Sequence, residues 1–170
     1  MNVRGRLFVP MAVAALACSA ITLAQAGAVP AASTTSCTGA QLGAHLGLSE
    51  GAAGTTYQVV RFRNHGSSAC TLDGFPRFVY LNAAGSQIGY AAQPTGTHHA
   101  VTIRPDHVAV GALGIPAYQN FPRARCHPRH ATAIRVTAPG THKHHTLPLS
   151  VTVCTTKLAR STSLAVRHHF

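Results

Sequence analysis

Apolar and polar side chains alternate along much of the chain after Gly54. The alternation is clearest over residues 57–64 and 133–137, and a period of two is typical of β-strands that bury one face. Short apolar runs bounded by turn residues predict further strands at 70–72, 78–81, 87–90, 100–104, 108–115, 147–154 and 164–166. The pattern therefore predicts eight or nine strands.

Two stretches break this pattern. Residues 37–50 predict a short helical turn with Leu42 and Leu46 on one face, and two glycines limit its length. Residues 116–128 contain three prolines and predict irregular structure. Because no later stretch supports a long amphipathic helix, we expect an all-β fold. The spacing of strands and turns predicts an immunoglobulin-like antiparallel β-sandwich, formed by a single domain over residues 37–170.

The first 28 residues have the order of a secretory signal peptide. Arg4 and Arg6 precede an almost entirely apolar stretch, and small residues follow up to Ala28. A signal peptidase accepts only small side chains, so we expect cleavage after Ala26 or Ala28 and a flexible leader over residues 29–36. The alternative is a membrane-spanning anchor, which the proline-containing, helix-poor sequence after the apolar stretch disfavours.

Cys18 lies inside the predicted signal. A lipoprotein signal would acylate such a cysteine, but it prefers a leucine three residues earlier, and Leu16 is only two residues earlier. We therefore expect Cys18 to leave with the signal. A lipid on this residue would instead make the mature protein membrane-anchored.

Four cysteines remain in the predicted mature chain: Cys37, Cys70, Cys126 and Cys154. An even number in an oxidising compartment predicts two disulfides, and four cysteines allow three pairings. We favour Cys37 with Cys70 and Cys126 with Cys154, because each pair closes a local segment of 33 (70 − 37) or 28 (154 − 126) residues. Zinc binding by these thiols is disfavoured, since the chain has no Cys-x-x-Cys pair.

The chain is strongly basic, with 14 lysines and arginines against three acids. Loss of Arg4 and Arg6 with the signal would leave 12 cations against three acids, a net charge of +9 with the histidines neutral. A protein with this charge is attracted to polyanions. Outside a cell, these are anionic envelope polymers, acidic membrane surfaces or free nucleic acid.

The densest basic group surrounds Cys126 and contains Arg123, Arg125 and Arg129. A disulfide at Cys126 would hold these side chains on a fixed frame, and arginine offers forked donors to phosphate and carboxylate. We expect them to contact an anionic envelope polymer or a membrane surface; a merely solvated face is the alternative. Specific nucleic-acid binding is not expected, because few stacking aromatics are interleaved with the arginines.

The chain also has twelve histidines. His142, His144 and His145 follow a Pro-Gly turn, and clustered imidazoles bind zinc or copper. On a strand, His142 and His144 would share a face. A histidine-rich, metal-binding extracellular protein is therefore the alternative function. A loop of histidines also binds either metal adventitiously, so we expect no dedicated cofactor.

The sequence offers little for catalysis. A hydrolytic triad or a carboxylate pair needs acids, and the chain has only Glu50, Asp73 and Asp106, the last two in turn-like contexts. The sequence also lacks a Gly-x-Ser-x-Gly elbow, a phosphate loop and a dinucleotide fingerprint. We expect a non-enzymatic protein, and a secreted hydrolase is the least favoured function.

Several segments resemble the family called domain of unknown function 4232. They are residues 51–57, 62–64, 70–76, 126–128 and 134–136 together with Cys154. The most specific of them is Cys-Thr-Leu-Asp-Gly-Phe-Pro at 70–76. The resemblance covers residues 37–166 and implies a β-rich domain, exported or lipid-anchored, from an actinobacterium, with the cysteine pairing favoured above.

The resemblance implies no activity and no catalytic residue. We therefore expect a secreted or envelope-associated protein that acts as a binding or structural module.

Overall fold

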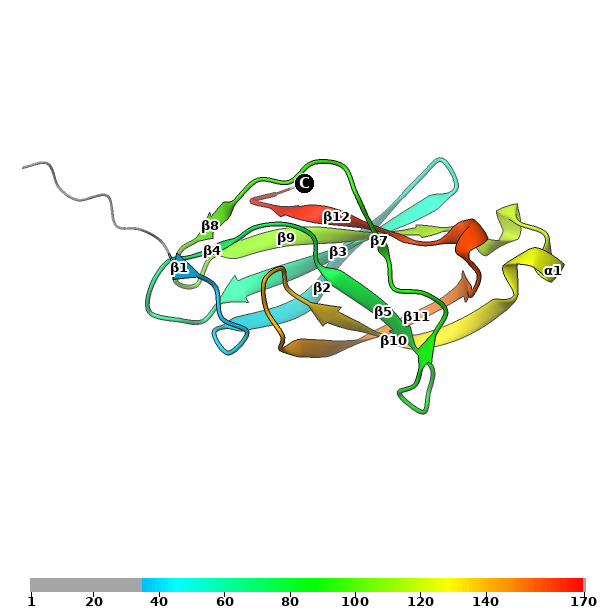
Figure 1. Cartoon of the computed structure of the whole chain (residues 1–170), viewed down its shortest axis with the longest axis horizontal. Helices are drawn as coiled ribbons and strands as arrows, with labels where there is room; N and C mark the ends of the chain where they lie inside the picture. The colour runs from blue at the N-terminus through cyan, green and yellow to red at the C-terminus, as the bar shows by residue number, and fades with distance from the viewer. Residues whose placement is uncertain (1–34, 170) are drawn as a thin grey trace, which may run out of the picture. The chain divides into compact units, whose positions relative to one another are not determined.

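The structure is a computed structural model that describes residues 35–169. These residues form the β domain of Figure 1. The predicted signal peptide, Cys18 and most of the predicted leader lie outside the described residues. The last two residues of that leader, Thr35–Ser36, form the short strand β1.

The largest sheet of the domain has five strands. Their order across the sheet is β2 (Leu42–Ala52), β3 (Thr55–Asn64), β9 (Val108–Pro116), β12 (Thr162–Arg167) and β7 (Gln93–Thr95). All neighbouring strands are antiparallel except β12 and β7. Strand β9 lies at the centre and is buried over residues 109–115. One of its faces packs in the core, and the other lines a hollow on the outer surface of the sheet.

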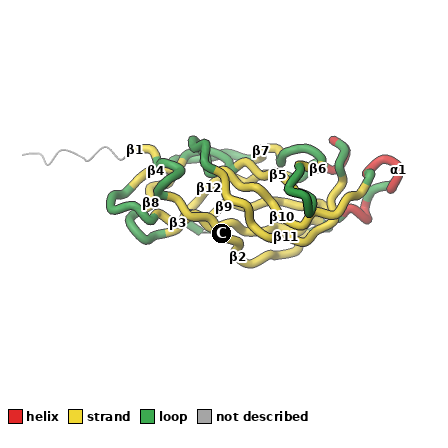
Figure 2. Tube along the Cα trace, turned by 90° about the horizontal axis from the view of Figure 1, so that it is seen from below, coloured by secondary structure: helices red, strands yellow, loops and turns green. Residues whose placement is uncertain are grey.

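Two smaller sheets complete the domain. The four-stranded sheet has the order β11 (His144–Cys154), β10 (Pro128–Thr137), β5 (Arg77–Leu81) and β6 (Gln87–Ile88). The three-stranded sheet has the order β1, β4 (Cys70–Leu72) and β8 (Val101–Ile103). In Figures 1 and 2, β1 lies at one end of the domain and the short helix α1 (Arg123–Cys126) at the other.

The core is formed by alternate residues of the strands. Val60, Phe62 and Leu113 come from the five-stranded sheet, and Phe78 and Ile134 from the four-stranded sheet; each is at most 1% exposed. Burying such side chains stabilises the fold by about 1.5–3 kcal/mol each. The predicted all-β sandwich is confirmed. Two parallel pairs, β1 with β4 and β7 with β12, depart from the otherwise antiparallel pattern.

Both predicted disulfides are present. Cys37 bonds Cys70 and Cys126 bonds Cys154, across sequence separations of 33 and 28 residues. Closing loops of this length restricts the unfolded chain by about 3–4 kcal/mol each in the chain-entropy account. The first bond lies beside β4 and the second beside α1, so each end of the domain has one covalent cross-link (Figure 1).

The predicted helical turn over residues 37–50 is wrong. Most of this segment belongs to β2, whose side chains at Leu42, Ala44 and Leu46 all face the core. The pairing with β3 shifts between Leu46 and Ser49, and this bulge interrupts the alternation that identifies a strand. Leucines four residues apart fit both a helix and a strand, and the long-range pairing with β3 decides between them.

Short elements account for the other differences from the predicted pattern. Residues 35–169 contain twelve strands rather than eight or nine, because the sequence predicts a helical turn in place of β2 and because β1 and β7 have only two and three residues. Such strands are too short for a periodic signal. The predicted irregular stretch 116–128 contains a 3-10 turn, η1 (Tyr118–Asn120), as well as α1.

Candidate anion-binding site

The helix α1 carries two of the three predicted anion-binding arginines. Pro122 precedes it, and the carbonyl of Pro122 accepts hydrogen bonds from the backbone N–H groups of Arg125 and Cys126, both at 2.9 Å. The helix ends after one turn because His127 adopts a left-handed conformation with φ = 48°. Within this turn the Cys126 side chain is fully buried and Arg123 and Arg125 are exposed.

The segment after β11 fixes the end of α1. The Thr155 N–H donates to the Cys126 carbonyl at 3.0 Å, and the Thr155 hydroxyl donates to the His127 carbonyl at 2.9 Å. The Thr156 hydroxyl donates to the Arg125 carbonyl at 2.8 Å. These bonds add to the disulfide between Cys126 and Cys154, so the backbone that carries the arginines is held by several independent contacts.

Arg129 lies nearby, at the start of β10. It lines an open hollow of about 660 Å³ with His130, and the other walls are Asn82, Ile88, Gly89 and Thr155. Gly89 allows this arrangement because a Cβ there would lie 3.1 Å from the Thr155 Cα, and its φ of +64° favours glycine. Arg129 is thus an exposed cation at the edge of a concave surface.

Two further cations lie at this end, on the turn η2 (Lys157–Ala159) and beside it. The Lys157 Nζ lies 5.6 Å from the ring centroid of Tyr90, and the Arg160 guanidinium carbon lies 5.8 Å from it. The Arg160 Nε–H donates to the Ala91 carbonyl at 2.7 Å. Tyr90 is 45% exposed, so an aromatic ring with two cations around it faces solvent.

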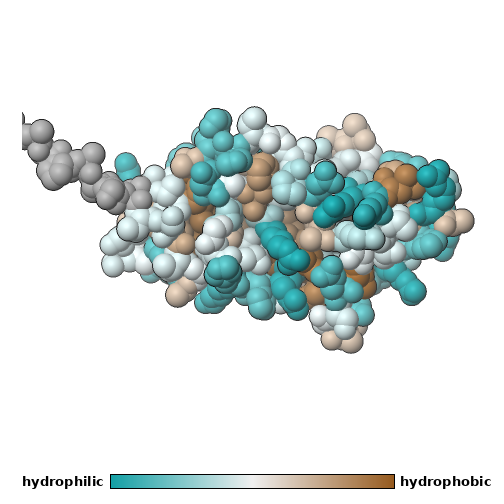
Figure 3. Space-filling model, in the orientation of Figure 1, coloured by the Kyte–Doolittle hydropathy of each residue, from teal (hydrophilic) through white to brown (hydrophobic). Residues whose placement is uncertain are grey.

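We call this group of cations the basic pole. It consists of Arg123, Arg125, Arg129, Lys157 and Arg160, and η2 contacts α1 directly. In Figure 3, hydrophilic side chains gather at the α1 end of the visible face, next to a hydrophobic group. The sequence alone indicated only the three arginines. A signal for the other two cations existed, since pairing Cys126 with Cys154 brings the residues after Cys154 next to α1.

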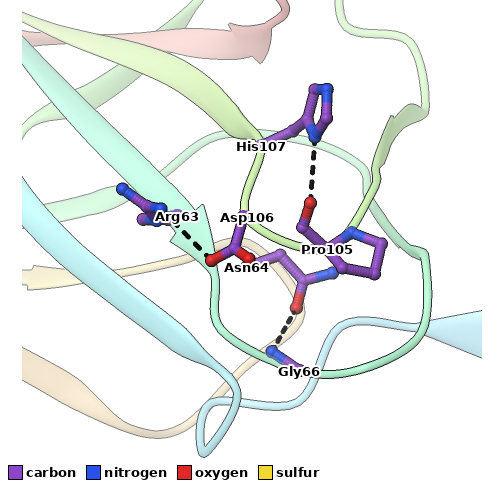
Figure 4. Close-up of polar contacts among 6 residues, drawn as sticks. All are labelled: Arg63, Asn64, Gly66, Pro105, Asp106 and His107. Carbon is purple, nitrogen blue, oxygen red and sulfur yellow. Dashed lines mark hydrogen bonds and ion pairs between the residues drawn. The ribbon is translucent and has the colours of Figure 1, made fainter.

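The acids lie elsewhere. The Asp106 carboxylate accepts from Arg63 at 3.2 Å at the end of β3 (Figure 4), and the Asp73 carboxylate lies 2.7 Å from His98 Nδ1, just after β4. Glu50 is on β2. Among residues 35–169 these are the two ion pairs, so the described part of the chain provides no carboxylate partner for the basic pole.

The predicted metal residues are not brought into one site. His144 and His145 begin β11 as adjacent residues, so their side chains point to opposite faces, and His142 lies in the loop before the strand. His142 is not part of the strand, so it does not share a strand face with His144. Within the described residues, no group of three or more histidines, cysteines or acids is arranged to hold a metal ion.

His145 differs from the other two histidines because it faces inward. Its burial lowers its pKa from the usual value, and the nearby positive charge of Lys143 adds to this effect. A hydrogen bond with the backbone of Leu42 opposes the shift, while His144 and His45 reinforce it weakly. The neutral imidazole is therefore favoured at the junction of β2 and β11.

Comparison with known families identifies the chain. The family model "Domain of unknown function (DUF4232)" matches residues 37–168. The chain belongs to this family. No curated protein and no solved structure matches it. The DUF4232 match covers both disulfides and every residue of the basic pole.

Two observations bear on the compartment. Two disulfides are typical of proteins that fold outside the reducing cytoplasm. None of the helices in the described part of the chain is long and apolar enough to span a membrane.

Proposed function

We propose that this DUF4232 protein is an exported, non-enzymatic module that binds an anionic polymer of the cell envelope through its basic pole. The observation that supports the proposal is charge segregation: five cations lie at one end of the domain, while both ion pairs lie at the other. Surface charges left without a partner keep their attraction for an external anion.

The geometry favours a polymer over a small anion. The cations belong to three separate segments, α1, the start of β10 and the η2 region, and all but the half-buried Arg160 are exposed rather than gathered in one enclosed cavity. A chain with regularly spaced phosphates or carboxylates would contact several of them at once, and each arginine could form a forked pair. Tyr90 adds an apolar surface against which a sugar or polyol unit could pack.

Salt-dependent retention on dextran sulfate tests this proposal, with the variant R123Q/R125Q/R129Q. Each exposed contact contributes about 0.5 kcal/mol, so losing three should weaken binding about tenfold. The matched control R77Q/K143Q/R167Q removes three exposed charges from other parts of the surface and should weaken binding much less. Equal losses in both variants would show that attraction depends on net charge alone, and the proposal would be overturned.

The metal-binding alternative stays a prediction. Calorimetric titration with zinc or copper, before and after changing His142, His144 and His145 to alanine, tests it directly.

The secreted-hydrolase alternative has one partial feature, the contact between His98 and Asp73. A histidine and an acid are two of the three members of a hydrolytic triad. Within residues 35–169, no serine or cysteine is hydrogen-bonded to His98 to supply a nucleophile, so the geometry does not favour this function.

A further inference from the structure

The outer face of the five-stranded sheet, away from the core, is hollowed along β3 and β9. Three adjoining cavities of about 340, 390 and 350 Å³ lie along it. The first two share Glu50 and Val59, and the last two share Val108 and His168. The cavities therefore form one continuous depression, which we call the outer groove.

The floor of the outer groove is apolar. Val59 of β3 pairs with Ala112 of β9, and Leu164 of β12 pairs with Ala112 from the other side. Val110 and Ala112 are 8% and 2% exposed and lie at the bottom, between larger side chains of the adjacent strands. Leu48 stands at the rim with 82% of its surface exposed. An apolar floor of this kind is unusual on the solvent face of a sheet, where polar side chains are the rule.

A glycine keeps one end of the groove flat. Gly114 pairs with Tyr57, and a Cβ at Gly114 would lie 3.2 Å from the Tyr57 ring and would overlap the Thr162 hydroxyl. The absence of a side chain lets the ring lie against β9. This end of the groove is lined by Tyr57, Val59, Ala112 and Leu164.

The other end of the groove is cationic. Arg61, His168 and His169 line the second cavity, and Arg104, His107 and His168 line the third. Arg61 and Arg104 are exposed, and neither forms an ion pair with another described residue. Glu50 lines the first two cavities and is the strand partner of Tyr57, and the third cavity has no acid in its lining. Negative charge in a ligand would therefore be attracted towards Arg61 and Arg104 and repelled from the Tyr57 end.

The dimensions match an extended chain. Tyr57 and Arg61, the outermost β3 residues of the groove, are four residues apart, which is roughly 13 Å at about 3.3 Å per residue. We propose that the outer groove binds a single-chain amphipathic anion, with the hydrocarbon chain over Val59, Ala112 and Leu164 and the anionic head group beside Arg61 and His168. This site lies on a different surface from the basic pole and does not depend on the proposed function.

A second copy of the chain is a poorer occupant. Pairing two outer grooves about a two-fold axis would bring the Arg61 clusters of two strongly basic molecules together, and like charges oppose such an interface. An amphipathic anion instead satisfies both properties of the groove, because it buries the apolar floor and neutralises the cationic end.

Calorimetry with two lysolipids, below their critical micelle concentrations, tests the proposal. Lysophosphatidylglycerol is anionic, and lysophosphatidylcholine of the same chain length carries no net charge. We expect saturable 1:1 binding of the anionic lipid, about tenfold tighter than the zwitterionic one. V59E should weaken binding of both lipids about tenfold, because it places a carboxylate in the apolar floor. R61Q should weaken only the anionic lipid, by about fivefold.

Two further measurements make the test decisive. Chemical shifts of the Val59, Val110 and Leu164 methyl groups should move with the anionic lipid, and R123Q/R125Q/R129Q should bind it like the wild type. If V59E fails to fold, L48E replaces it, since the Leu48 side chain is mostly exposed. The proposal would be overturned if binding did not saturate, if both lipids bound with equal affinity, or if the chemical-shift changes were confined to another face. Dimerisation that V59E abolishes would assign the groove to a second copy instead.

Discussion

The two ends of this domain are cross-linked in the same way but differ in their polar groups. At the Cys37–Cys70 end, Asp106 pairs with Arg63 and Asp73 contacts His98. At the Cys126–Cys154 end, four exposed cations and the half-buried Arg160 surround α1 and η2 with no acid among them. A disulfide and short loops thus hold two different kinds of surface: one whose acids are paired within the molecule, and one whose cations have no acid among them.

The end that holds the two ion pairs is organised around Asn64, which is fully buried. Its side-chain N–H groups donate to the Ser68 and Ile103 carbonyls at 2.8 and 3.0 Å, and its side-chain oxygen accepts from the Gly66 N–H at 2.9 Å. Figure 4 shows the last of these bonds beside the contact of Arg63 with Asp106. Asn64 therefore joins the end of β3 to the turn that follows it and to β8.

Removing the two disulfides one at a time should have the largest effect on the two ends of the domain. We expect C37A/C70A and C126A/C154A each to lower the free energy of unfolding by about 3–4 kcal/mol, because the closed loops are similar in length. Only C126A/C154A should also weaken retention on dextran sulfate, since it frees the backbone of α1. Urea unfolding and salt-dependent chromatography measure the two effects. Equal loss of retention in both variants would contradict a local role for the second disulfide.

Substituting Asn64 should have the next largest effect. N64A leaves the Ile103 carbonyl and the Gly66 N–H without their buried partner, so we expect a loss of about 2–3 kcal/mol in unfolding free energy. The control is N82A at the other end. Asn82 also accepts two backbone hydrogen bonds, from Ala84 and Ser86, but it lies in an exposed turn, and its loss should cost about 1 kcal/mol or less. Similar losses in both variants would show that burial at Asn64 is unimportant.

The smallest expected effect is a pH dependence from His145. Its pKa is lower in the folded protein than the usual 6.5 or so of an unfolded chain. The unfolded state therefore takes up the proton first, and stability is complete above about pH 6.5 and falls as the pH drops towards the folded-state pKa. H145Q should lose less stability than the wild type between pH 8 and pH 5 in urea unfolding. The stability of the control variant H130Q, changed at an exposed histidine, should fall over this pH range as that of the wild type does. If the stability of H145Q falls just as much, the pH dependence does not come from His145.

The short-range pattern of apolar and polar residues was sufficient to predict most strands. Residues 57–64 and 133–137 alternate clearly and form parts of β3 and β10. It failed at β2, where the bulge between Leu46 and Ser49 interrupts the alternation and the pairing partner is β3. Local sequence cannot distinguish a helix from a strand when the deciding contacts come from another segment.

The candidate site was predictable only in part, for the same reason. Arg123, Arg125 and Arg129 are conspicuous because they are close together in sequence. Tyr90 and Arg160 join them only through the folding of the chain, which brings residues about 70 positions apart next to each other, as in the 69-residue separation of Arg160 and Ala91.

Composition and spacing alone determined that this chain is basic, all-β and cross-linked by two local disulfides, because charge, alternation and cysteine spacing are properties of neighbouring residues. Only the tertiary structure decided where the charges gather and which strand faces adjoin. The basic pole requires the Cys126–Cys154 pairing to bring η2 beside α1, and the outer groove requires β3, β9 and β12 to lie side by side. These are long-range contacts, and they arise from burying one face of each strand in a common core.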